Sequence, residues 1–241
     1  MIRKPTLVDT GILRQLLDGV PMLPETAFSV MEMMHKPDTA PSALARVVAQ
    51  DPGLTVQTLH LCNSPFYSLP VEVVSIEHAV RLLGVPTVCG IVMAAYVHGF
   101  MARFSGEGAR LWLRGARRHV LTVADGAQHL AACCPVGISK SEAFTVGLLH
   151  DIGKLVLAQL DEATARAVEQ RAAVPDTLLV DAEWDVLGTD HAEAGFLLAQ
   201  RWGLPELIAE VIRWHHRPQK SGEALVLLVF LANELADVQE G

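Results

Sequence analysis

An imidazole and a carboxylate stand side by side at His150-Asp151, inside the otherwise apolar run Gly147-Leu-Leu-His-Asp-Ile-Gly-Lys154. Adjacent residues on a helix point about 100° apart, so the two side chains could serve one metal ion or bridge two. A polar pair that interrupts an apolar helix is costly to bury without a partner. We therefore predict a metal site here, and we expect Gly153 to allow the close approach of another backbone or a ligand.

Ten histidines occur in the chain, more than its 241 residues need. His119 precedes the His-Asp pair, and His191 and the pair His215-His216 follow it, with Asn233 farther on. A single histidine is more often a hydrogen-bonded core or surface residue than a metal ligand. We interpret five histidines in this ordinary way, namely His35, His60, His78, His98 and His129.

The elements that must position these side chains are predicted to be helices. Apolar residues recur at helical spacing almost everywhere, and no sustained alternation of apolar and polar residues indicates a strand. Ser139 with Glu142, and Asp190 with Glu193, have the spacing of capping boxes. The chain is therefore predicted to be all-α. The expected helices cover residues 7–17, 25–35, 42–50, 54–62, 76–83, 87–103, 109–133, 140–160, 162–172, 178–187, 191–202, 206–215 and 223–238.

A short polar stretch, Phe104-Ser-Gly-Glu-Gly108, is the best candidate for a boundary between two helical parts. The helices expected after it are longer than those before it. We predict an N-terminal helical subdomain over residues 1–105 and a second subdomain, with the His/Asp cluster, over residues 106–241.

The composition limits the kinds of partner that the chain can have. The formal net charge is −8, and the basic residues are scattered apart from a short cluster at Arg114, Arg117 and Arg118. A nucleic-acid-binding surface needs a concentration of positive charge, which this sequence lacks. We therefore expect protein or small-ligand partners and no nucleic acid.

Several features bear on the location of the protein. Residues 85–102 carry no formal charge, but Pro86, Gly90 and the lack of aromatic and basic flanks favour a buried core helix over a membrane span. Residues 1–13 lack the apolar centre of a secretory signal. The cysteines have no C-x-x-C spacing and are expected to be free buried thiols in a reducing cytosol: Cys62, Cys89, Cys133 and Cys134. The expected location is the cytoplasm.

The histidines and the His-Asp pair resemble the HD superfamily of metal-dependent phosphohydrolases, in which a His, a His-Asp pair and a distant Asp converge on a metal. The resemblance implies that His119 is the first ligand and that His150 and Asp151 are the central pair. Members with two or three metals add histidines, to which His191, His215 and His216 are similar. We expect all six side chains to face one cavity, since burying them separately would be costly. An imidazole-rich site favours iron, manganese, zinc or nickel over magnesium or calcium.

The resemblance breaks at the last ligand, where Asn233 stands in place of the aspartate of that family. Asparagine offers only a neutral carbonyl oxygen, which should weaken metal binding. Asp237, one helical turn beyond, is the alternative as a shifted ligand. The Gly-Tyr-Pro signature of the HD-GYP phosphodiesterases is also absent, because His215-His216 is followed by Arg217-Pro-Gln.

The first half of the chain resembles HDOD domains in particular. The matching segments are Pro21-Met-Leu-Pro24, Asp51-Pro-Gly-Leu54, Asn63-Ser64 followed by Phe66-Tyr67, and residues 76–84 ending in Arg81-Leu-Leu-Gly84. The resemblance runs from about Leu16 to Ala236 and implies an HD-like helical bundle with an N-terminal helical subdomain. Asp51 and Asn63 are interpreted as residues that mark the ends of helices. Phe66-Tyr67 is interpreted as an exposed pair available for partner contact.

The resemblance to HDOD domains implies a non-catalytic regulator of bacterial signal transduction that acts through protein partners. The alternative is a metal-dependent phosphohydrolase that acts on a nucleotide or a cyclic dinucleotide. In that case Lys154 would contact a phosphate of the substrate.

Overall fold

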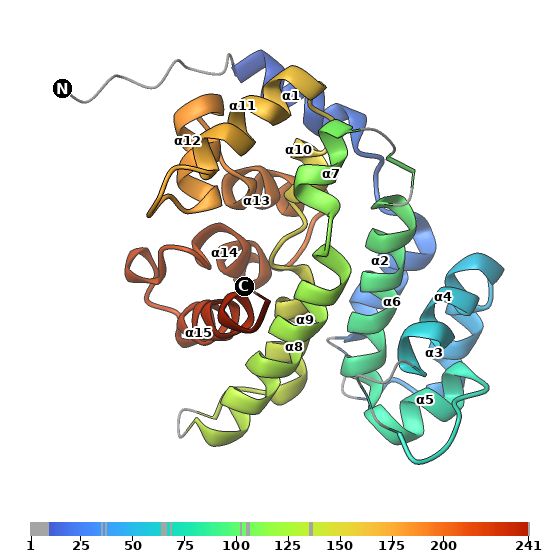
Figure 1. Cartoon of the computed structure of the whole chain (residues 1–241). Helices are drawn as coiled ribbons and strands as arrows, with labels where there is room; N and C mark the ends of the chain where they lie inside the picture. Colours follow the sequence, from blue (N-terminus) through green and yellow to red (C-terminus); the bar gives the residue numbers. More distant parts are fainter. Residues whose placement is uncertain are drawn as a thin grey trace.

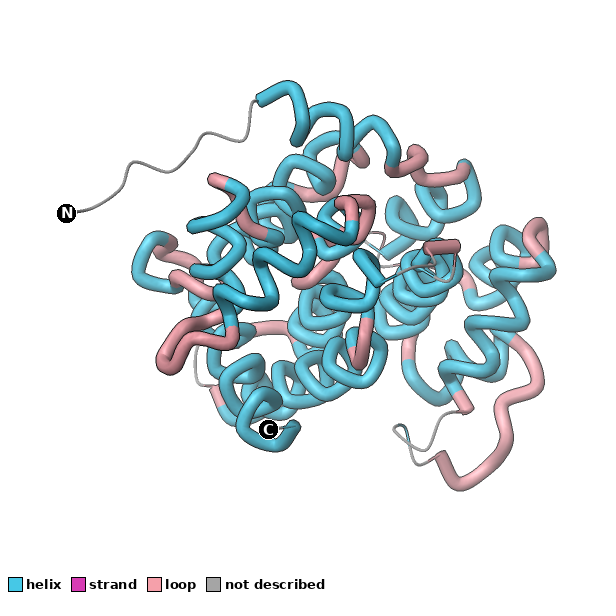
Figure 2. The backbone as a smooth tube through the Cα atoms, turned by 45° about the horizontal axis from the view of Figure 1, so that its top comes forward, coloured by secondary structure: helices cyan, strands magenta, loops and turns pink. Residues whose placement is uncertain are grey.

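The computed structural model describes residues 10–34, 36, 38–63, 67, 69–101, 103–104, 107–134 and 137–240. These residues form helices joined by short connections, and no strand occurs among them, which confirms the all-α prediction (Figures 1 and 2). The helices are α1 (Thr10–Gly19), α2 (Glu25–Met34), α3 (Pro41–Val48), α4 (Pro52–Cys62), α5 (Ile76–Leu83), α6 (Val85–Met101), α7 (Glu107–Leu113), α8 (Ala116–Cys133), α9 (Lys140–Leu149), α10 (Lys154–Leu157), α11 (Glu162–Ala172), α12 (Leu179–Leu187), α13 (His191–Arg201), α14 (Glu206–Trp214) and α15 (Ala224–Glu240), with a 3-10 turn at Pro218–Lys220.

Helix α9 joins the two sides of the molecule. It packs against α8, α14 and α15 on one side and against α6 on the other, and α2, α3, α4 and α5 surround α6 (Figure 1). Phe144 and Leu148 of α9 lie in the core of the α2–α6 side, whereas Val146 and Leu149 lie in the core of the other side. One helix therefore belongs to both cores, and the turn at its end carries His150 and Asp151.

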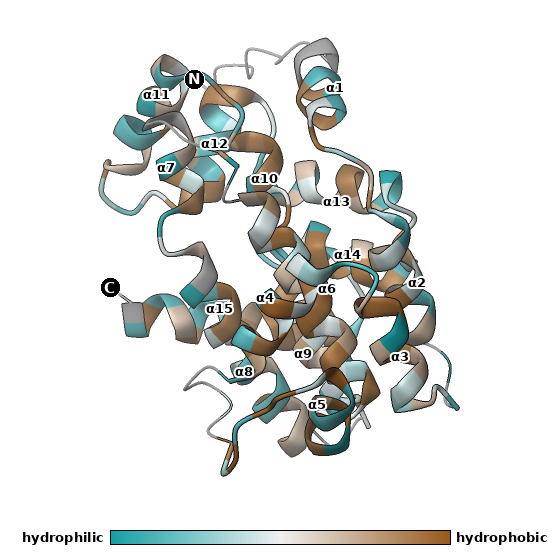
Figure 3. Ribbon diagram, turned by 90° about the vertical axis from the view of Figure 1, so that its right-hand side faces the viewer, coloured by the Kyte–Doolittle hydropathy of each residue, from teal (hydrophilic) through white to brown (hydrophobic). Residues whose placement is uncertain are grey.

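Helix α6 is the uncharged segment that approaches the length of a membrane span. Its Val88, Ile91, Val92 and Met93 are almost completely buried, and its hydrophobic ribbon lies in the interior in Figure 3. The prediction of a buried core helix is therefore confirmed. Among the helices that the structure describes, none combines the length and apolar character needed to traverse a bilayer.

The division at residue 105 stays a prediction, and α1 shows how closely the two parts are connected. Gln159 donates a hydrogen bond from Nε2 to the carbonyl oxygen of Leu16 at 2.8 Å. The indole nitrogen of Trp202 donates to the carbonyl oxygen of Pro21 at 3.0 Å. The first helix thus packs against α10 and α13, far along the sequence.

Two of the predicted helices are wrong as continuous elements. The expected helix over residues 109–133 breaks before α8 at Gly115, whose φ of 76° is left-handed. The expected helix over residues 140–160 breaks between α9 and α10, where turn hydrogen bonds such as Lys154 N to Asp151 O (3.0 Å) replace the α-helical pattern. Apolar periodicity misses the break after His150 because the residues around it remain buried, and it misses the break at Gly115 because a helical pattern tolerates a single glycine. His150 and Asp151 therefore lie in a turn at the end of α9 and not within a helix.

The predicted caps are confirmed where a side chain meets the first turn of a helix. Ser139 Oγ accepts from the backbone N–H of Glu142, Asp190 Oδ1 from that of Glu193, and Asp51 Oδ1 from that of Leu54. Asn63 spans a loop by pairing both its amide groups with the backbone of Val73, at 2.7 and 2.8 Å. Asp51 and Asn63 therefore have the structural role that the sequence indicates.

Two sequence interpretations of single residues need correction. The ring of Tyr67 packs against Phe144 at 5.8 Å between centroids, and burial raises the pKa of its hydroxyl, so the expected exposure is wrong for Tyr67, while Phe66 lies outside the described residues. Cys62 and Cys89 are buried as expected, and burial raises the pKa of each thiol to about 12. Cys133 is exposed and Cys134 half-buried, because α8 ends there.

Glycines allow the backbones that carry the site residues to touch. A Cβ built on Gly147 would lie 2.6 Å from Ala124 Cα, so α8 and α9 cross in direct contact. A Cβ on Gly153 would lie 1.8 Å from the carbonyl oxygen of His191 and 2.5 Å from the backbone nitrogen of Gly195. The expectation that Gly153 permits close approach is confirmed, and the neighbour is the backbone of α13.

We predict that Gly153→Ala destabilises the protein by about 3 kcal/mol or more, because a methyl group cannot overlap a backbone carbonyl and α13 would have to move. Chemical denaturation monitored by circular dichroism measures the change. Gly222→Ala is the matched control, since a Cβ there meets nothing within 4 Å and should change stability by less than about 1 kcal/mol. Equal stability of the two variants would contradict the close contact.

Candidate metal centre

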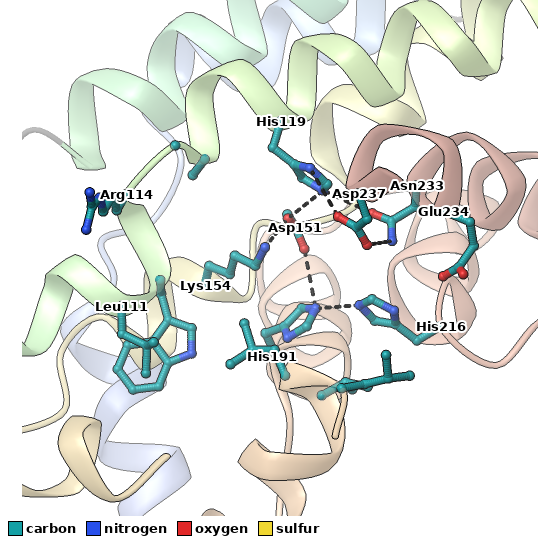
Figure 4. Close-up of a pocket in the computed structure, with 16 residues that line it drawn as sticks. Leu111, Arg114, His119, Asp151, Lys154, His191, His216, Asn233, Glu234 and Asp237 are labelled. Carbon is teal, nitrogen blue, oxygen red and sulfur yellow. Dashed lines mark hydrogen bonds and ion pairs between the residues drawn. The ribbon is translucent and has the colours of Figure 1, made fainter. Parts of the chain in front are cut away.

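The structure brings together all six predicted metal-ligand residues, which we call the His/Asp cluster. His119 lies on α8, His150 and Asp151 in the turn after α9, His191 at the start of α13, and His215 and His216 after α14. Neighbouring imidazole rings lie 4.2 to 5.5 Å apart between centroids. Figure 4 shows His119, Asp151, His191 and His216 converging from these separate elements.

Asp151 occupies the centre of the cluster and separates it into two halves. Its Oδ2 lies 3.8 Å from His119 Nε2 and 3.4 Å from His150 Nε2. Its Oδ1 lies 3.4 Å from His191 Nε2 and 3.7 Å from His215 Nε2. One carboxylate thus faces two sets of imidazole nitrogens, one set with each oxygen.

The two halves have the geometry of two metal-ligand sets. The candidate ligand atoms of His119, His150 and Asp151 all lie within 4.8 Å of one another, and so do those of His191, His215 and His216. Three ligands of nitrogen or carboxylate oxygen form the usual protein part of a metal site with open positions. With Asp151 between them, the sets could hold one ion each with a shared carboxylate.

Backbone hydrogen bonds orient the two most buried imidazoles. His150 Nδ1 donates to the carbonyl oxygen of Gly147, and His215 Nδ1 to that of Ile212, both at 2.7 Å. Each Nε2 is then a lone-pair nitrogen, and neither has a hydrogen-bond partner although both are fully buried. A buried polar atom without a partner is costly, so these two nitrogens fit coordination to a metal ion.

Glu183 orients His191 and was missed by the sequence analysis. Its Oε2 accepts hydrogen bonds from His191 Nδ1 at 2.6 Å and from the His191 backbone N–H at 2.9 Å. Its Oε1 accepts from the indole nitrogen of Trp112 at 2.6 Å. The carboxylate is completely buried on α12, and a carboxylate behind an imidazole is a common support of metal-binding histidines. Asp181 and Asp185 flank it in sequence but are exposed, so only the phase of the helix distinguishes Glu183.

Asn233 lies beside the first half of the cluster. Its Oδ1 is 3.0 Å from His119 Nε2, and its Nδ2 donates to Asp237 Oδ2 at 3.3 Å. Asp237 Oδ1 lies 3.7 Å from the other ring nitrogen of His119, Nδ1. The amide of Asn233 therefore faces the ligand nitrogen, whereas Asp237 holds the opposite edge of the ring.

The charged groups of the cluster stabilise one another. Burial opposes ionisation of Asp151, but electrostatic interactions with His150 and Lys154 outweigh it and hold its pKa well below the usual range. Burial likewise opposes the charge of Lys154, yet Asp151, 2.5 Å from its Nζ, raises the pKa of Lys154. Burial and neighbouring imidazoles hold the pKa values of His215 and His216 well below their usual range, so both are neutral and available as ligands. Burial opposes the charge of His191, but Glu183 raises its pKa.

A cavity of about 260 Å³ opens over the cluster. His119, Asp151, His191 and His216 line it, together with Lys154, and Arg114 stands at its edge (Figure 4). The expectation that all six residues face one cavity is therefore wrong for His150 and His215, which are fully buried beneath it.

Comparison with known proteins identifies a matching family and similar solved structures. The HDOD domain family matches residues 20–218. An HDOD domain protein of unknown function from Geobacter sulfurreducens has a TM-score of 0.79 and 27% identity, over 95% of this chain and 78% of that chain. A protein of Shewanella amazonensis SB2B, provisionally named a phosphohydrolase, has a TM-score of 0.76 and 28% identity, over 97% of this chain and 82% of that chain.

Two further comparisons show that similar sequences occur within longer proteins. A protein of Marinobacter aquaeolei VT8, provisionally named a signal transduction protein, has a TM-score of 0.76 and 26% identity, over 98% of this chain and 51% of that chain. A Treponema pallidum (strain Nichols) protein of uncharacterised function is 28% identical over 207 residues, which are 83% of this chain. The match covers 38% of the Treponema protein.

We predict that Glu183→Gln weakens Zn²⁺ or Mn²⁺ binding about 10- to 100-fold. Glutamine has one carbonyl oxygen, so it cannot accept from both His191 and Trp112. Competition with a chromogenic chelator measures the change. Asp185→Asn, an exposed position on the same helix, is the control and should bind metal as the wild type does; equal weakening in both variants would contradict the role of Glu183.

We also predict that the metal-free protein loses stability as the pH falls below about 6.5. The unfolded chain protonates His215 and His216 near that pH, while the folded state keeps them neutral, so acid favours unfolding. Fully buried His215 alone gives a slope of up to about 1.4 kcal/mol per pH unit. His191 has the opposite shift, so its stabilising contribution grows as the pH falls towards 6.5 and stays constant below that pH.

Urea unfolding in EDTA at a series of pH values tests this sign. In His215→Gln the free energy of unfolding should fall less steeply with decreasing pH, because this variant lacks the imidazole that is protonated only in the unfolded chain. A constant free energy of unfolding from pH 7 to pH 5 in the wild type would show that the two imidazoles are not held neutral.

Proposed function

The chain belongs to the HDOD domain family, and from that membership we propose a regulatory module of bacterial signal transduction. The module would bind transition-metal ions at the His/Asp cluster, act through protein partners and have no phosphohydrolase turnover. A similar Marinobacter protein, provisionally named a signal transduction protein, supports a signalling role. The partners and the two-part division at residue 105 belong to the same proposal.

The proposal that the module is not catalytic rests on the position of Asn233 beside His119. Its neutral amide oxygen lies 3.0 Å from His119 Nε2, where an anionic ligand would balance the charge of a metal ion. Asp237, one turn farther along the same helix, contacts the other edge of the His119 ring. The half of the cluster formed by His119, His150 and Asp151 thus has one negative charge, and Lys154 already neutralises it.

The residues present fit one or two ions of a metal that prefers nitrogen. His119, His150 and Asp151 would hold one ion, and His191, His215 and His216, with the other oxygen of Asp151, would hold the second. Iron, manganese, zinc and nickel suit this donor set. Such an ion would supply Lewis-acid activation of water and neutralise phosphoryl charge.

The cavity itself also argues against a large substrate. Its volume of about 260 Å³ is below the range of about 300–1,000 Å³ that is usual for pockets of drug-sized ligands. A cyclic dinucleotide would therefore need the cavity walls to move. Arg114 and Lys154 at the cavity can bind a phosphate or carboxylate group of a smaller ligand.

A second candidate function, metal-dependent phosphohydrolase, is favoured by one observation. The cluster is already assembled, with lone pairs of two buried imidazoles directed into it, and it opens to a cavity that contains Lys154. The Shewanella protein at 28% identity is provisionally named a phosphohydrolase. In this alternative Lys154 would bind the phosphate of the substrate, and His119 and Asp151 would orient it.

We predict that the wild type, loaded with Mn²⁺ or Fe²⁺, binds metal but does not hydrolyse p-nitrophenyl phosphate, nucleotides or cyclic dinucleotides. Asn233→Asp should bind metal about tenfold more tightly, because it adds an anionic ligand beside His119. The same variant should be less stable when metal-free, because the new carboxylate faces Asp237 and loses the hydrogen bond from Asn233.

Metal analysis after dialysis, a phosphate-release assay and thermal unfolding measure these outcomes. Asp151→Asn is the control that should lose metal in both halves of the cluster. Metal-dependent turnover by the wild type that disappears in Asp151→Asn would overturn the non-catalytic proposal in favour of the hydrolase. Wild-type protein that retains no metal after loading would overturn the metal-binding part.

A further inference from the structure

A second cavity, of about 460 Å³, lies beside the same segments as the metal centre but shares none of its lining residues. It is bordered by the end of α12, the start of α13 and the end of α14. Its walls combine aromatic and cationic side chains: Trp184, Trp214, Arg213, Arg217 and Lys220, with Thr189 at its base. Nothing in the metal-site function uses this cavity.

The cavity has an excess positive charge. Arg213 is paired with Glu193 at 2.9 Å, and Arg217 with Asp190 at 3.1 Å and with Asp181 at 3.8 Å. Lys220 has no carboxylate partner among the described residues, and its ammonium lies 5.2 Å from the centre of the Trp214 ring. This local excess occurs on a chain whose formal net charge is −8, so it favours an anionic ligand.

Thr189 supplies an independent sign of a missing ligand. Its side-chain oxygen is buried without a hydrogen-bond partner, and the residue is only 7% exposed. An unsatisfied buried hydroxyl costs free energy comparable to a lost hydrogen bond. Thr189 lines the cavity with its hydroxyl just beneath the cavity wall, so a polar ligand would satisfy this hydroxyl after a small local movement of that wall.

Trp184 provides an apolar surface for a planar group. Its side chain is 40% exposed although it borders the cavity, and the guanidinium of Arg217 lies 5.8 Å from its ring centre. Indole faces are good platforms for stacking nucleobases, and Arg and Lys side chains bind phosphate oxygens. Both requirements of a nucleotide are therefore met in one pocket.

We propose that this second cavity binds a nucleotide, with the base on Trp184, the phosphate at Lys220 and Arg217, and a hydrogen bond to Thr189. The volume of about 460 Å³ lies within the usual range for small-molecule sites. The inference goes beyond the proposed function and does not rest on it, because none of these groups belongs to the His/Asp cluster.

The test is isothermal titration of the full chain, treated with EDTA, with GMP, guanosine and inorganic phosphate. GMP should bind with one-to-one stoichiometry and more tightly than guanosine or phosphate alone, because only GMP offers both a base and a phosphate. Removing metal keeps failure of this proposal separate from failure of metal binding. Phosphate or guanosine binding as tightly as GMP would overturn the nucleotide assignment, as would the absence of GMP binding at millimolar concentration.

Three variants locate the bound nucleotide. Lys220→Ala should raise the dissociation constant about tenfold, because a charge-assisted hydrogen bond is lost. Thr189→Val should raise it about fivefold while leaving thermal stability equal or higher, because it removes an unsatisfied hydroxyl. Lys140→Ala removes an exposed lysine at the start of α9 and should have no effect. Wild-type affinity in either of the first two variants would overturn the site.

Discussion

The ionised carboxylate of Asp151 is the group on which the site depends. It is almost completely buried, and a buried negative charge persists only where positive charge and hydrogen-bond donors surround it. Lys154 from the next turn provides that environment together with His191 of α13, whose Nε2 lies 3.4 Å from the other carboxylate oxygen. The turn after α9 and the start of α13 must therefore meet at this point, because the carboxylate is unstable if either of them withdraws.

Close backbone packing makes this meeting possible. Gly147 lets α9 touch α8, and Gly153 lets the turn after Asp151 touch α13 at His191. At Gly126 of α8, by contrast, a Cβ would make only an ordinary contact with Ala232, the neighbour of Asn233. His150, Asp151 and His191 are thus each within a few positions of a contact that admits no larger side chain. The geometry of the cluster is a property of the helix crossings more than of the side chains themselves.

The sequence predicts some features of this structure better than others, because some depend on neighbouring residues and others depend on the tertiary structure. Caps such as Asp190 are local, so the starts of most helices could be predicted well. The break after His150 could not, because burial continues across it and apolar periodicity is insensitive to a change of direction. The break at Gly115 could not because a helical pattern tolerates a single glycine. The prediction that His119 and Asp151 lie together came from their order along the chain, which resembles the order of the metal ligands in the HD superfamily. Glu183 has no such signal, since two exposed aspartates surround it and only the tertiary structure shows which acid is buried.

The ion pair between Lys154 and Asp151 also bears on how a metal ion would bind. An ammonium group already contacts one oxygen of this carboxylate, so the negative charge of Asp151 is balanced in the metal-free protein. A metal ion bound at that oxygen would compete with Lys154 for it. Lys154 lines the cavity, so an ammonium group released from this ion pair would add unpaired positive charge to the cavity surface.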